Sequence, residues 1–501
     1  MKNIHQLLVA IFIISGFIFA GCEDFLDKQP VSQLSRDKYW KTAKDADIWM
    51  AAMYDGMQNT LSRNWYIWGE VRSDNPELAG TGTAQLRFLT NTITADMGEC
   101  NWNELYRTIS SANYAIKYIP TIPDVIPQQV ASQLAQAYTM RALMYFYAVR
   151  VWGPVPLITE PYEGFDGQER FNSRTEVAKI KEQIQNDIAK ALEYFDTNTP
   201  SVYLLNRGSA LALQTDVHLW FKEYNEAIAS SDQLIALKKY TLVSKADDWK
   251  KMFVDPSTST EPIFNMYWDF LQDGSNGLAA FFASASNTPN YKSERAVWDT
   301  LVARQTDARI MSVADTVLLW YKGGKTKVTY EHYQYYDRQV PKFAAFDPAQ
   351  YNSTYNYSGG YVYASNNESQ THIPIYRMSD IMLLRAEALN KVGRGAEAID
   401  IVNAIRKRMG YNKVLTASNT PNAASLENAI LIERQLELWG EGKRWFDLVR
   451  TNKVSEIMDP IIKLRGIPEG FGDLRKILFP IHSSVFEANP KITQNEPYTQ
   501  N

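Results

Sequence analysis

The stretch from residue 376 to residue 450 constrains the fold most, because its apolar residues follow two successive helical repeats. They recur every three or four residues up to Gly393, and again from Ala396 to Gly410, which is typical of amphipathic α-helices. Glycine tolerates the positive φ angle that often follows a helix, so we predict that the second helix ends at Gly410. Ser425 is the predicted N-cap of a third helix. Because each helix has one apolar face to bury, the stretch indicates a helical hairpin inside a larger helical core.

A second hairpin, predicted over residues 207–236, aligns with the first one without gaps. Residues 215–228 match residues 386–399, and both segments end in Glu-Ala-Ile. Two further helical pairs are predicted at 37–57 with 102–119, and at 128–151 with 176–195. Tetratricopeptide repeats are helix–turn–helix units of roughly 34 residues, and the loops here are longer than that repeat allows. We therefore predict a mainly α fold of four irregular tetratricopeptide-like pairs.

The N-terminus has the pattern of a bacterial lipoprotein signal. Lys2 precedes an apolar run over residues 7–19, and the run leads into Phe19-Ala20-Gly21-Cys22, as in a signal peptide with small residues at the cleavage site. The four residues resemble a lipobox, with Phe19 where leucine is usual. We predict cleavage before Cys22 and lipidation of its thiol, which would anchor the chain to a membrane. The alternative is an ordinary signal peptide with an incidental cysteine.

The residues after the predicted cleavage site indicate where the anchored protein resides. Glu23 and Asp24 resemble the surface-export signal of Bacteroidetes lipoproteins. We expect an outer-membrane protein that is lipid-anchored and faces the cell exterior. With Cys22 lipidated, Cys100 is left as the other cysteine of the chain, so no internal disulfide is expected. Cys100 is predicted to be a small buried apolar residue.

Composition and motifs exclude several functional classes. The net charge is −4 with both signs mixed along the chain, whereas a nucleic-acid partner normally requires a basic face. The catalytic motifs H-E-x-x-H and G-x-S-x-G are missing from the sequence. The histidines of the mature chain are widely separated, so no metal site is predicted from them. We predict a protein that is not an enzyme and needs no cofactor; whether a loop holds a structural Ca²⁺ is left open.

Three glutamates stand four residues apart near the C-terminal end of the helical stretch: Glu433, Glu437 and Glu441. This spacing places them on one helix face, where like charges repel unless they are paired. A glycosidase would need two carboxyl groups flanking a cleft instead. We interpret the glutamates as an ionic network, and the predicted cationic partners are Arg434, Lys443, Arg444 and Arg450. Replacing Glu433 or Arg444 is expected to lower stability without changing any sugar specificity.

Blocks spread over nearly the whole mature chain carry a family resemblance. They include Phe25-Leu26-Asp27, Tyr39-Trp40, Arg141-Ala142, Trp152-Gly153-Pro154-Val155-Pro156, Glu433-Arg434, Glu441-Gly442, Phe479-Pro480-Ile481 and Asn489-Pro490. In this order they resemble the SusD/RagB nutrient-uptake lipoproteins of the Bacteroidetes outer membrane. The family usually ends in Gln-Asn-Pro-Gly-Tyr, and here Glu496-Pro497-Tyr498 follows Gln494-Asn495.

The resemblance implies both a fold and a function. The fold would be four tetratricopeptide-like pairs beside a loop-rich, aromatic, ligand-binding portion. The function would be capture of an oligosaccharide by a lipid-anchored lid, which delivers it to a SusC-like TonB-dependent transporter without enzymatic activity. Some members of the family bind peptides, and that alternative stays open. Two readings outside this function are a tetratricopeptide scaffold lipoprotein without a transport role and a surface glycoside hydrolase.

Sugar binding requires flat aromatic faces together with planar polar groups for the hydroxyls. Two stretches offer both, namely the loop after the first predicted helix and the aromatic insert over residues 240–375. Long inserts on a rigid scaffold are common places for binding sites. The predicted glycan-binding residues are Trp65, Trp68, Arg72, Asp74, Asn75, Trp268, Tyr291, Trp298 and Trp320. For each aromatic residue the alternative is packing in the core.

These interpretations divide the chain into five segments. They are a signal peptide (1–21), a lipidated tether (22–36), an N-terminal helical region with the first three pairs (37–239), the loop-rich aromatic insert (240–375), and a C-terminal region with the fourth pair and the closing helices (376–501).

Overall fold

The structure of the chain is a computed structural model. It describes residues 39–499 except for 80–81, 124, 165–168, 197–200, 245–247, 250–251, 254, 275–276, 278–280, 282–289, 305, 310–344, 347–360 and 363–371. The predicted signal peptide, the tether with Cys22, and Trp320 lie outside the described residues.

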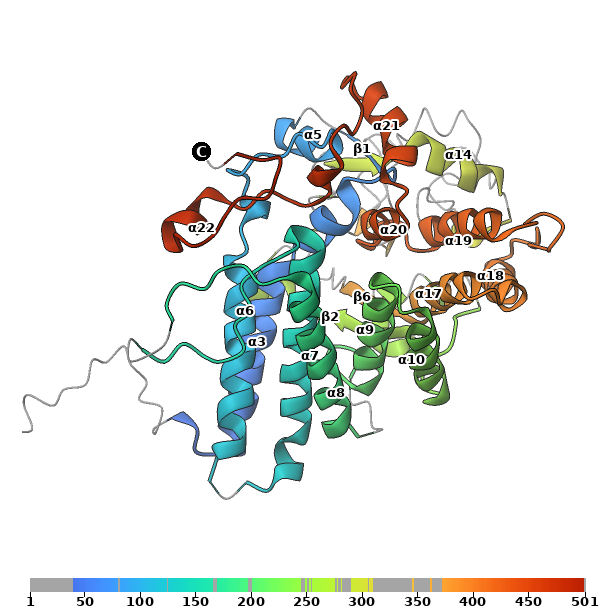
Figure 1. The fold of residues 1–501 in the computed structure, drawn as a ribbon. Coiled ribbons are helices and arrows are strands. Elements are labelled where there is room, and N and C mark those ends of the chain that lie inside the picture. Colours follow the sequence, from blue (N-terminus) through green and yellow to red (C-terminus); the bar gives the residue numbers. More distant parts are fainter. Residues whose placement is uncertain are drawn as a thin grey trace, which may run out of the picture.

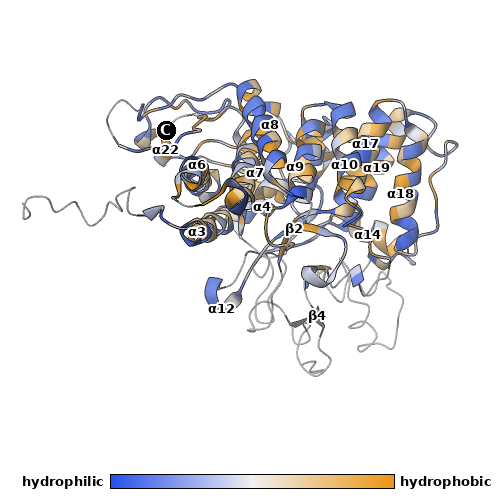
Figure 2. Ribbon diagram, turned by 90° about the horizontal axis from the view of Figure 1, so that it is seen from below, coloured by the Kyte–Doolittle hydropathy of each residue, from blue (hydrophilic) through white to orange (hydrophobic). Residues whose placement is uncertain are grey.

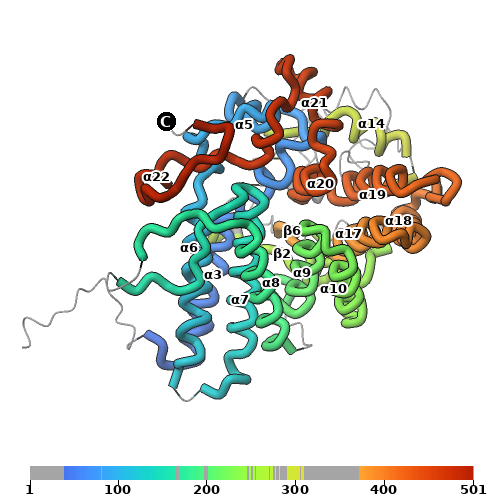
Figure 3. Tube along the Cα trace, viewed as in Figure 1, coloured from blue at the N-terminus to red at the C-terminus, as the bar shows by residue number. Residues whose placement is uncertain are grey.

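Four pairs of helices form the scaffold, and they are the four pairs that the sequence predicts (Figure 1). They are α3 (Ala43–Leu61) with α6 (Asn103–Tyr118), α7 (Pro127–Trp152) with α8 (Val177–Tyr194), α9 (Arg207–Trp220) with α10 (Tyr224–Ala236), and α17 (Met378–Lys391) with α18 (Gly395–Arg408). The mainly helical class is confirmed, while the tetratricopeptide-like character of the pairs stays a prediction. Helix α10 packs against α17, so the third and fourth pairs are neighbours although the insert separates them in sequence (Figure 3).

Helix α7 is the central element, and its buried residues occupy nearly its whole circumference. It packs against α3, α6, α8 and α9. Pro127 stands in its first turn, where the missing amide proton costs nothing. The helix ends at Trp152, and Gly153 follows it with a φ of 72°, which suits glycine.

The cap of helix α19 (Ala423–Glu437) corrects one prediction. Its N-cap is Asn422, whose side chain accepts a hydrogen bond from the Ser425 backbone amide at 2.9 Å. The Ser425 hydroxyl accepts one in return from the Asn422 amide at 3.1 Å. Both residue types favour caps, and the extended backbone of Asn422 places it first in this reciprocal arrangement. Gly410, with φ of 82°, follows helix α18 as predicted.

The remaining elements are short. They are α4 (Asn64–Tyr66), η2 (Ile67–Val71), β1 (Pro76–Leu78), α5 (Thr83–Leu89), η3 (Gly98–Cys100), η4 (Ile119–Thr121), η5 (Pro256–Thr258), β2 (Pro262–Met266), α12 (Phe270–Asp273), β3 (Tyr291–Ser293), α14 (Arg295–Ala303), β4 (Ala345–Phe346), β5 (Tyr361–Val362), β6 (Ile373–Arg377), α20 (Arg444–Arg450), α21 (Val454–Leu464), η9 (Leu474–Ile477) and α22 (Ser483–Ala488). None of the helices within the described residues is long and apolar enough to cross a membrane.

Three antiparallel strand pairs involve the insert: β1 with β3, β2 with β6, and β4 with β5. Strand β2 lies near the start of the insert and β6 at its end, so their pairing closes the insert at its base. The two ends of the insert therefore lie side by side, next to helix α9.

The three glutamates lie in a buried ionic network, as predicted. We call this network the ionic core; it consists of Glu261, Asp307, Glu433, Glu437 and Glu441 with Arg304, Arg309, Arg377, Arg406 and Arg408. Arg377 is central, because its guanidinium lies 2.7 Å from Glu437 and 2.8 Å from Glu441. Glu433 lies 2.6 Å from Arg309. Opposite charges thus compensate one another where little water reaches them.

The predicted partners of the glutamates were wrong. Arg434 and Lys443 pair with Asp380, Arg444 with Asp74, and Arg450 with Glu387, while Arg434 and Arg450 also share Asp447. Helix α19 ends at Glu437, and Gly440 and Gly442, with φ of 77° and 67°, turn the chain before α20 begins. The cations after this turn therefore lie on another element, and the insert, the end of strand β6 and helix α18 supply the partners of the glutamates.

Candidate functional site

The tryptophans predicted to bind glycan in the first loop are core residues. Trp65 and Trp68 are each 1% exposed. The Trp68 indole donates a hydrogen bond to the Glu99 carbonyl at 2.9 Å, and its ring packs edge-on against Trp152 with centroids 5.2 Å apart. Neither ring has a free face for a sugar. The structure therefore corrects the prediction for both, because the loop folds under the C-terminal region instead of lying on the surface.

The polar residues of that loop bind other parts of the protein. The guanidinium of Arg72 donates to the Ile477 carbonyl at 2.7 Å and lies 4.1 Å from the centre of the Trp445 ring. Burial lowers the pKa of Arg72 to about 10. Asp74 accepts two hydrogen bonds from Arg444, at 2.7 and 2.9 Å. These contacts join the loop to the C-terminal region, so they correct the assignment of Arg72 and Asp74 to the glycan.

Asn75 and the nearby Glu70 complete this junction. The Asn75 amide donates to Glu70 at 2.5 Å. The buried Glu70 carboxylate also accepts hydrogen bonds from the backbone amides of Gly440, Lys443 and Arg444, at 2.9, 3.0 and 3.4 Å. Burial raises the pKa of Glu70 to about 7, although these donors favour its charged form. Asn75 is thus a structural residue as well.

The described aromatic residues predicted from the insert are also buried. Tyr291 and Trp298 are 1% and 2% exposed, and Trp268 is 7% exposed. The Trp268 indole donates to the Gly274 carbonyl at 2.8 Å, and its backbone amide donates to Nδ1 of His372 at 3.1 Å. Trp268 therefore holds the base of the insert together and offers no ring face to a ligand.

At the base of the insert, Tyr267, the residue before Trp268, is exposed. It is 45% exposed and stacks on His372 with centroids 5.2 Å apart and an angle of 23° between the planes. Tyr203, which is half-buried, contacts Tyr267 edge-on at 5.2 Å and His372 at 4.7 Å. We call Tyr203, Tyr267 and His372 the tyrosine patch.

The sequence predicts Trp268 as the ligand-binding residue, whereas the adjacent Tyr267 is the exposed one. Strand β2 ends at Met266. Beyond its end the Trp268 indole turns inward and donates to the Gly274 carbonyl, while Tyr267 stays exposed. The preference for tryptophan as a sugar platform favoured the buried residue. Recognition of β2 as a strand would not have identified Tyr267, because every residue of β2 is buried and Tyr267 lies beyond its end.

Polar side chains flank the tyrosine patch. Gln58 on α3 donates to the Tyr267 carbonyl at 2.7 Å, which links the patch to the helical scaffold. Asp269 and Asp273 accept hydrogen bonds from the backbone amides of Leu271 and Asp269, at 2.9 and 2.8 Å, and thereby shape the turn around α12. Helix α12 lies on the side of the molecule away from α8 and α17 (Figure 2). The patch therefore sits at the base of the insert with carboxylates beside it.

His372 is neutral at physiological pH. Burial lowers its pKa to about 4, and the nearby Asp255 carboxylate opposes this shift. Because Nδ1 accepts the Trp268 amide, the single ring proton resides on Nε2. A neutral buried ring gives Tyr267 a rigid apolar support, which suits binding of a ligand better than proton transfer. Across the described residues, no group of three or more His, Cys, Asp or Glu side chains is arranged to hold a metal ion.

Comparison with known proteins gives the family. SusD-like protein P38 of Formosa agariphila is 30% identical over 524 residues, which cover 99% of this chain and 100% of that protein. The chain belongs to the SusD family. The profile of the SusD family matches residues 260–498, and a profile described as starch-binding associating with outer membrane matches residues 24–219. The family expected from the sequence is thus confirmed.

Solved structures of SusD-like proteins share the fold. A laminarin-binding SusD-like protein superposes with a TM-score of 0.72 at 22% identity, and the match covers 92% of this chain and 100% of that one. A SusD superfamily protein from Bacteroides thetaiotaomicron gives a TM-score of 0.71 at 22% identity over 91% of this chain and 99% of the other. At this identity the likeness establishes the arrangement of the elements in this SusD-family chain.

Proposed function

We propose that this SusD-family protein is a surface glycan-binding lipoprotein that captures an oligosaccharide and acts as a lid on a SusC-like TonB-dependent transporter. The observation that carries the glycan-binding part is the exposed ring of Tyr267, supported by the buried His372. Aromatic faces bind the apolar C–H surface of a sugar ring, and a rigid platform loses little conformational entropy on binding. Membership of a family with a starch-binding profile supports the same ligand class.

The charges beside the tyrosine patch favour a neutral glycan. The carboxylates of Asp269 and Asp273 can accept hydrogen bonds from sugar hydroxyls, and the Gln58 amide adds a planar polar group within the same region. A uronic acid or a sulfated sugar would bring further negative charge toward these aspartates. Neutral glucans are therefore the first ligands to test.

The test of glycan binding compares two tyrosines of similar exposure. Tyr267 and Tyr162 are 45% and 43% exposed, and Tyr162 lies in the loop between α7 and α8. Once an array of neutral glycans has identified a ligand, calorimetry should show affinity about tenfold lower for Tyr267→Ala and unchanged for Tyr162→Ala. Equal affinities of Tyr267→Ala and the unaltered protein would contradict the site. Binding of peptides in place of every glycan would contradict the ligand class.

The anchor and the transporter require a separate test. Cys22 is the proposed lipidated residue, so Cys22→Ala should release the protein from the outer membrane into a soluble fraction. A TonB-dependent transporter should copurify with the lipidated protein from membranes. Retention of Cys22→Ala in the membrane would refute the anchor, and purification without any transporter would refute the lid.

A further inference from the structure

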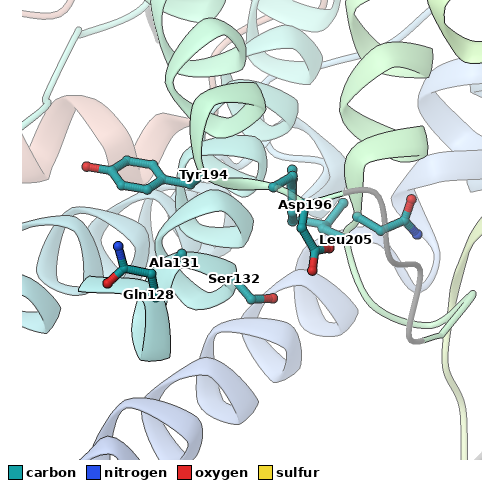
Figure 4. A pocket seen from close by; sticks show the side chains of 8 residues that line it. Gln128, Ala131, Ser132, Tyr194, Asp196 and Leu205 are labelled. Atoms are coloured by element: carbon teal, nitrogen blue, oxygen red, sulfur yellow. The ribbon is translucent and has the colours of Figure 1, made fainter. Parts of the chain in front are cut away.

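A recess lies between the start of helix α7 and the end of helix α8, with a volume of about 480 Å³. We call it the Tyr194 pocket; its lining residues are Gln128, Ala131, Ser132, Tyr194, Phe195, Asp196, Leu205 and Asn206. Figure 4 shows Gln128 and Ser132 on α7 and Tyr194 and Asp196 at the end of α8. The volume lies within the range of small-molecule sites. None of these residues belongs to the tyrosine patch.

The aromatic wall of the pocket is held in a fixed orientation. Tyr194 is 37% exposed, and its ring stacks on Tyr138 with centroids 6.2 Å apart and an angle of 7° between the planes. Tyr138 extends from helix α7, which is itself packed on several sides. The Tyr194 ring is thus a supported platform in the same way as the Tyr267 ring. Phe195 and Leu205 are buried and provide an apolar floor.

A directed chain of hydrogen bonds ends at the Ser132 hydroxyl. The Leu205 backbone amide donates to the Tyr54 hydroxyl at 2.8 Å, and this hydroxyl donates to Oε1 of Gln136 at 2.6 Å. The Gln136 amide then donates to the Ser132 oxygen at 3.0 Å. Because this oxygen already accepts a hydrogen bond, its own proton can be donated toward the pocket. The scaffold thereby presents a hydroxyl donor among the residues that line the pocket.

The remaining polar groups suit a neutral ligand with several hydroxyls. The Asp196 carboxylate accepts hydrogen bonds, and the Gln128 side chain both donates and accepts them. Both residues are exposed at the rim of the pocket. A sugar hydroxyl is also both a donor and an acceptor, so a pyranose ring matches this mixture. Asp196 is the charged residue among those that line the pocket, and it disfavours an anionic ligand.

We infer that the Tyr194 pocket is a second saccharide subsite, which binds a neutral pyranose against the Tyr194 ring with the hydroxyls directed to Ser132 and Asp196. The choice of a sugar rests on the proposed glycan-binding function. The subsite is close to the first one in the chain, because Leu205 in the pocket follows Tyr203 of the tyrosine patch by two residues.

The test uses the full chain purified in detergent and saturation-transfer NMR of methyl glycosides. Neutral probes are the α- and β-glucosides, the β-galactoside and the α-mannoside, and the β-glucuronide is the anionic comparison. At least one neutral glycoside should bind about tenfold more weakly to Tyr194→Ala and also weaken with Ser132→Ala. Tyr162→Ala is the matched control, with 43% exposure against 37% for Tyr194, and should leave binding unchanged.

The two sites fail in distinguishable ways. If Tyr267→Ala weakens glycoside binding and Tyr194→Ala does not, the second subsite is overturned and the proposed function remains. Binding that depends on Tyr194 and not on Tyr267 supports the subsite and contradicts the patch. If no neutral glycoside gives a Tyr194-dependent signal, the inference is overturned. If circular dichroism shows that Tyr194→Ala does not fold, Ser132→Ala replaces it in the test, and unchanged glycoside binding by Ser132→Ala then overturns the inference.

Discussion

Replacement of Glu437 by glutamine tests the structural interpretation of the ionic core. The side chain keeps its size and loses its charge. In the unaltered protein its carboxylate lies 2.7 Å from Arg377 and 3.2 Å from Arg309, and it also contacts Arg408. Glutamine would turn an amide toward the same guanidinium groups. Among the described residues the ionic core holds five carboxylates and five guanidinium groups, so this change removes a negative charge from among buried guanidinium groups.

The expected loss follows from the burial of all the partners. Glu437 is 0% exposed and Arg377 is 1% exposed. Removing one member of such a buried pair typically costs about 3–5 kcal/mol, because the remaining charge stays out of water. Many proteins have only about 5–15 kcal/mol of total stability. Urea unfolding followed by circular dichroism should therefore show a clearly lower midpoint for Glu437→Gln at an unchanged slope.

Glu397→Gln is the matched control for this experiment. Glu397 pairs with Arg394 on the surface of α18, where the two side chains are 49% and 46% exposed. Because water screens this pair, the urea midpoint of Glu397→Gln should equal that of the unaltered protein within error. Equal midpoints for Glu437→Gln and Glu397→Gln would refute the reasoning.

The pH dependence provides a second readout for Glu437. The neighbouring guanidinium groups hold the pKa of Glu437 well below its usual range, against the opposing effect of burial. A depressed pKa in the folded state contributes stability above the unfolded pKa of about 4.3. The difference in the free energy of unfolding between the unaltered protein and Glu437→Gln should therefore be largest at neutral pH. It should shrink as the pH is lowered below about 4.3.

Three further predictions concern the first loop, and those for Gly442 and Glu70 test its junction with the C-terminal region. Gly442→Ala should lower the free energy of unfolding by about 1–3 kcal/mol, since φ is +67° and the added Cβ would lie 2.5 Å from Cε3 of Trp65; chemical denaturation measures this, and an unchanged midpoint would contradict it. Trp68→Ala should lower the free energy of unfolding by about 3–5 kcal/mol. Calorimetry should show unchanged glycan affinity for the folded variant. Burial raises the pKa of Glu70 to about 7, so its contribution to stability should fall as pH rises from about 4.3 to 7. Glu70→Gln should remove that part of the pH slope, and identical slopes would exclude the assignment.

The scaffold helices could be predicted because their determinants are local. Apolar spacing and glycine after helix ends depend on residues within a few turns, so the four pairs and the end of α18 just before Gly410 follow from the sequence. The cap of α19 was missed by three residues because Asn422 and Ser425 are both capping residues. The choice between them depends on which one adopts the extended backbone.

The ligand-facing residues could not be chosen from composition alone. Trp65, Trp68 and Trp298 have the residue type that sugar binding favours, and all three are buried. Whether a ring is covered depends on elements distant in sequence; Trp68, for example, packs against Trp152 and bonds to Glu99.

Local patterns along the chain were enough to predict the family, the helical scaffold and a buried charge network near Glu433. The identity of the cations in that network depends on packing between elements distant in sequence. Arg309 lies in the insert and Arg377 ends strand β6, and both reach the glutamates only in the folded protein. Packing at the base of the insert likewise leaves Tyr267 exposed and buries Trp268. The physical reason is the same in both cases: spacing along the chain specifies which face of an element a residue occupies, and packing between elements specifies what that face meets.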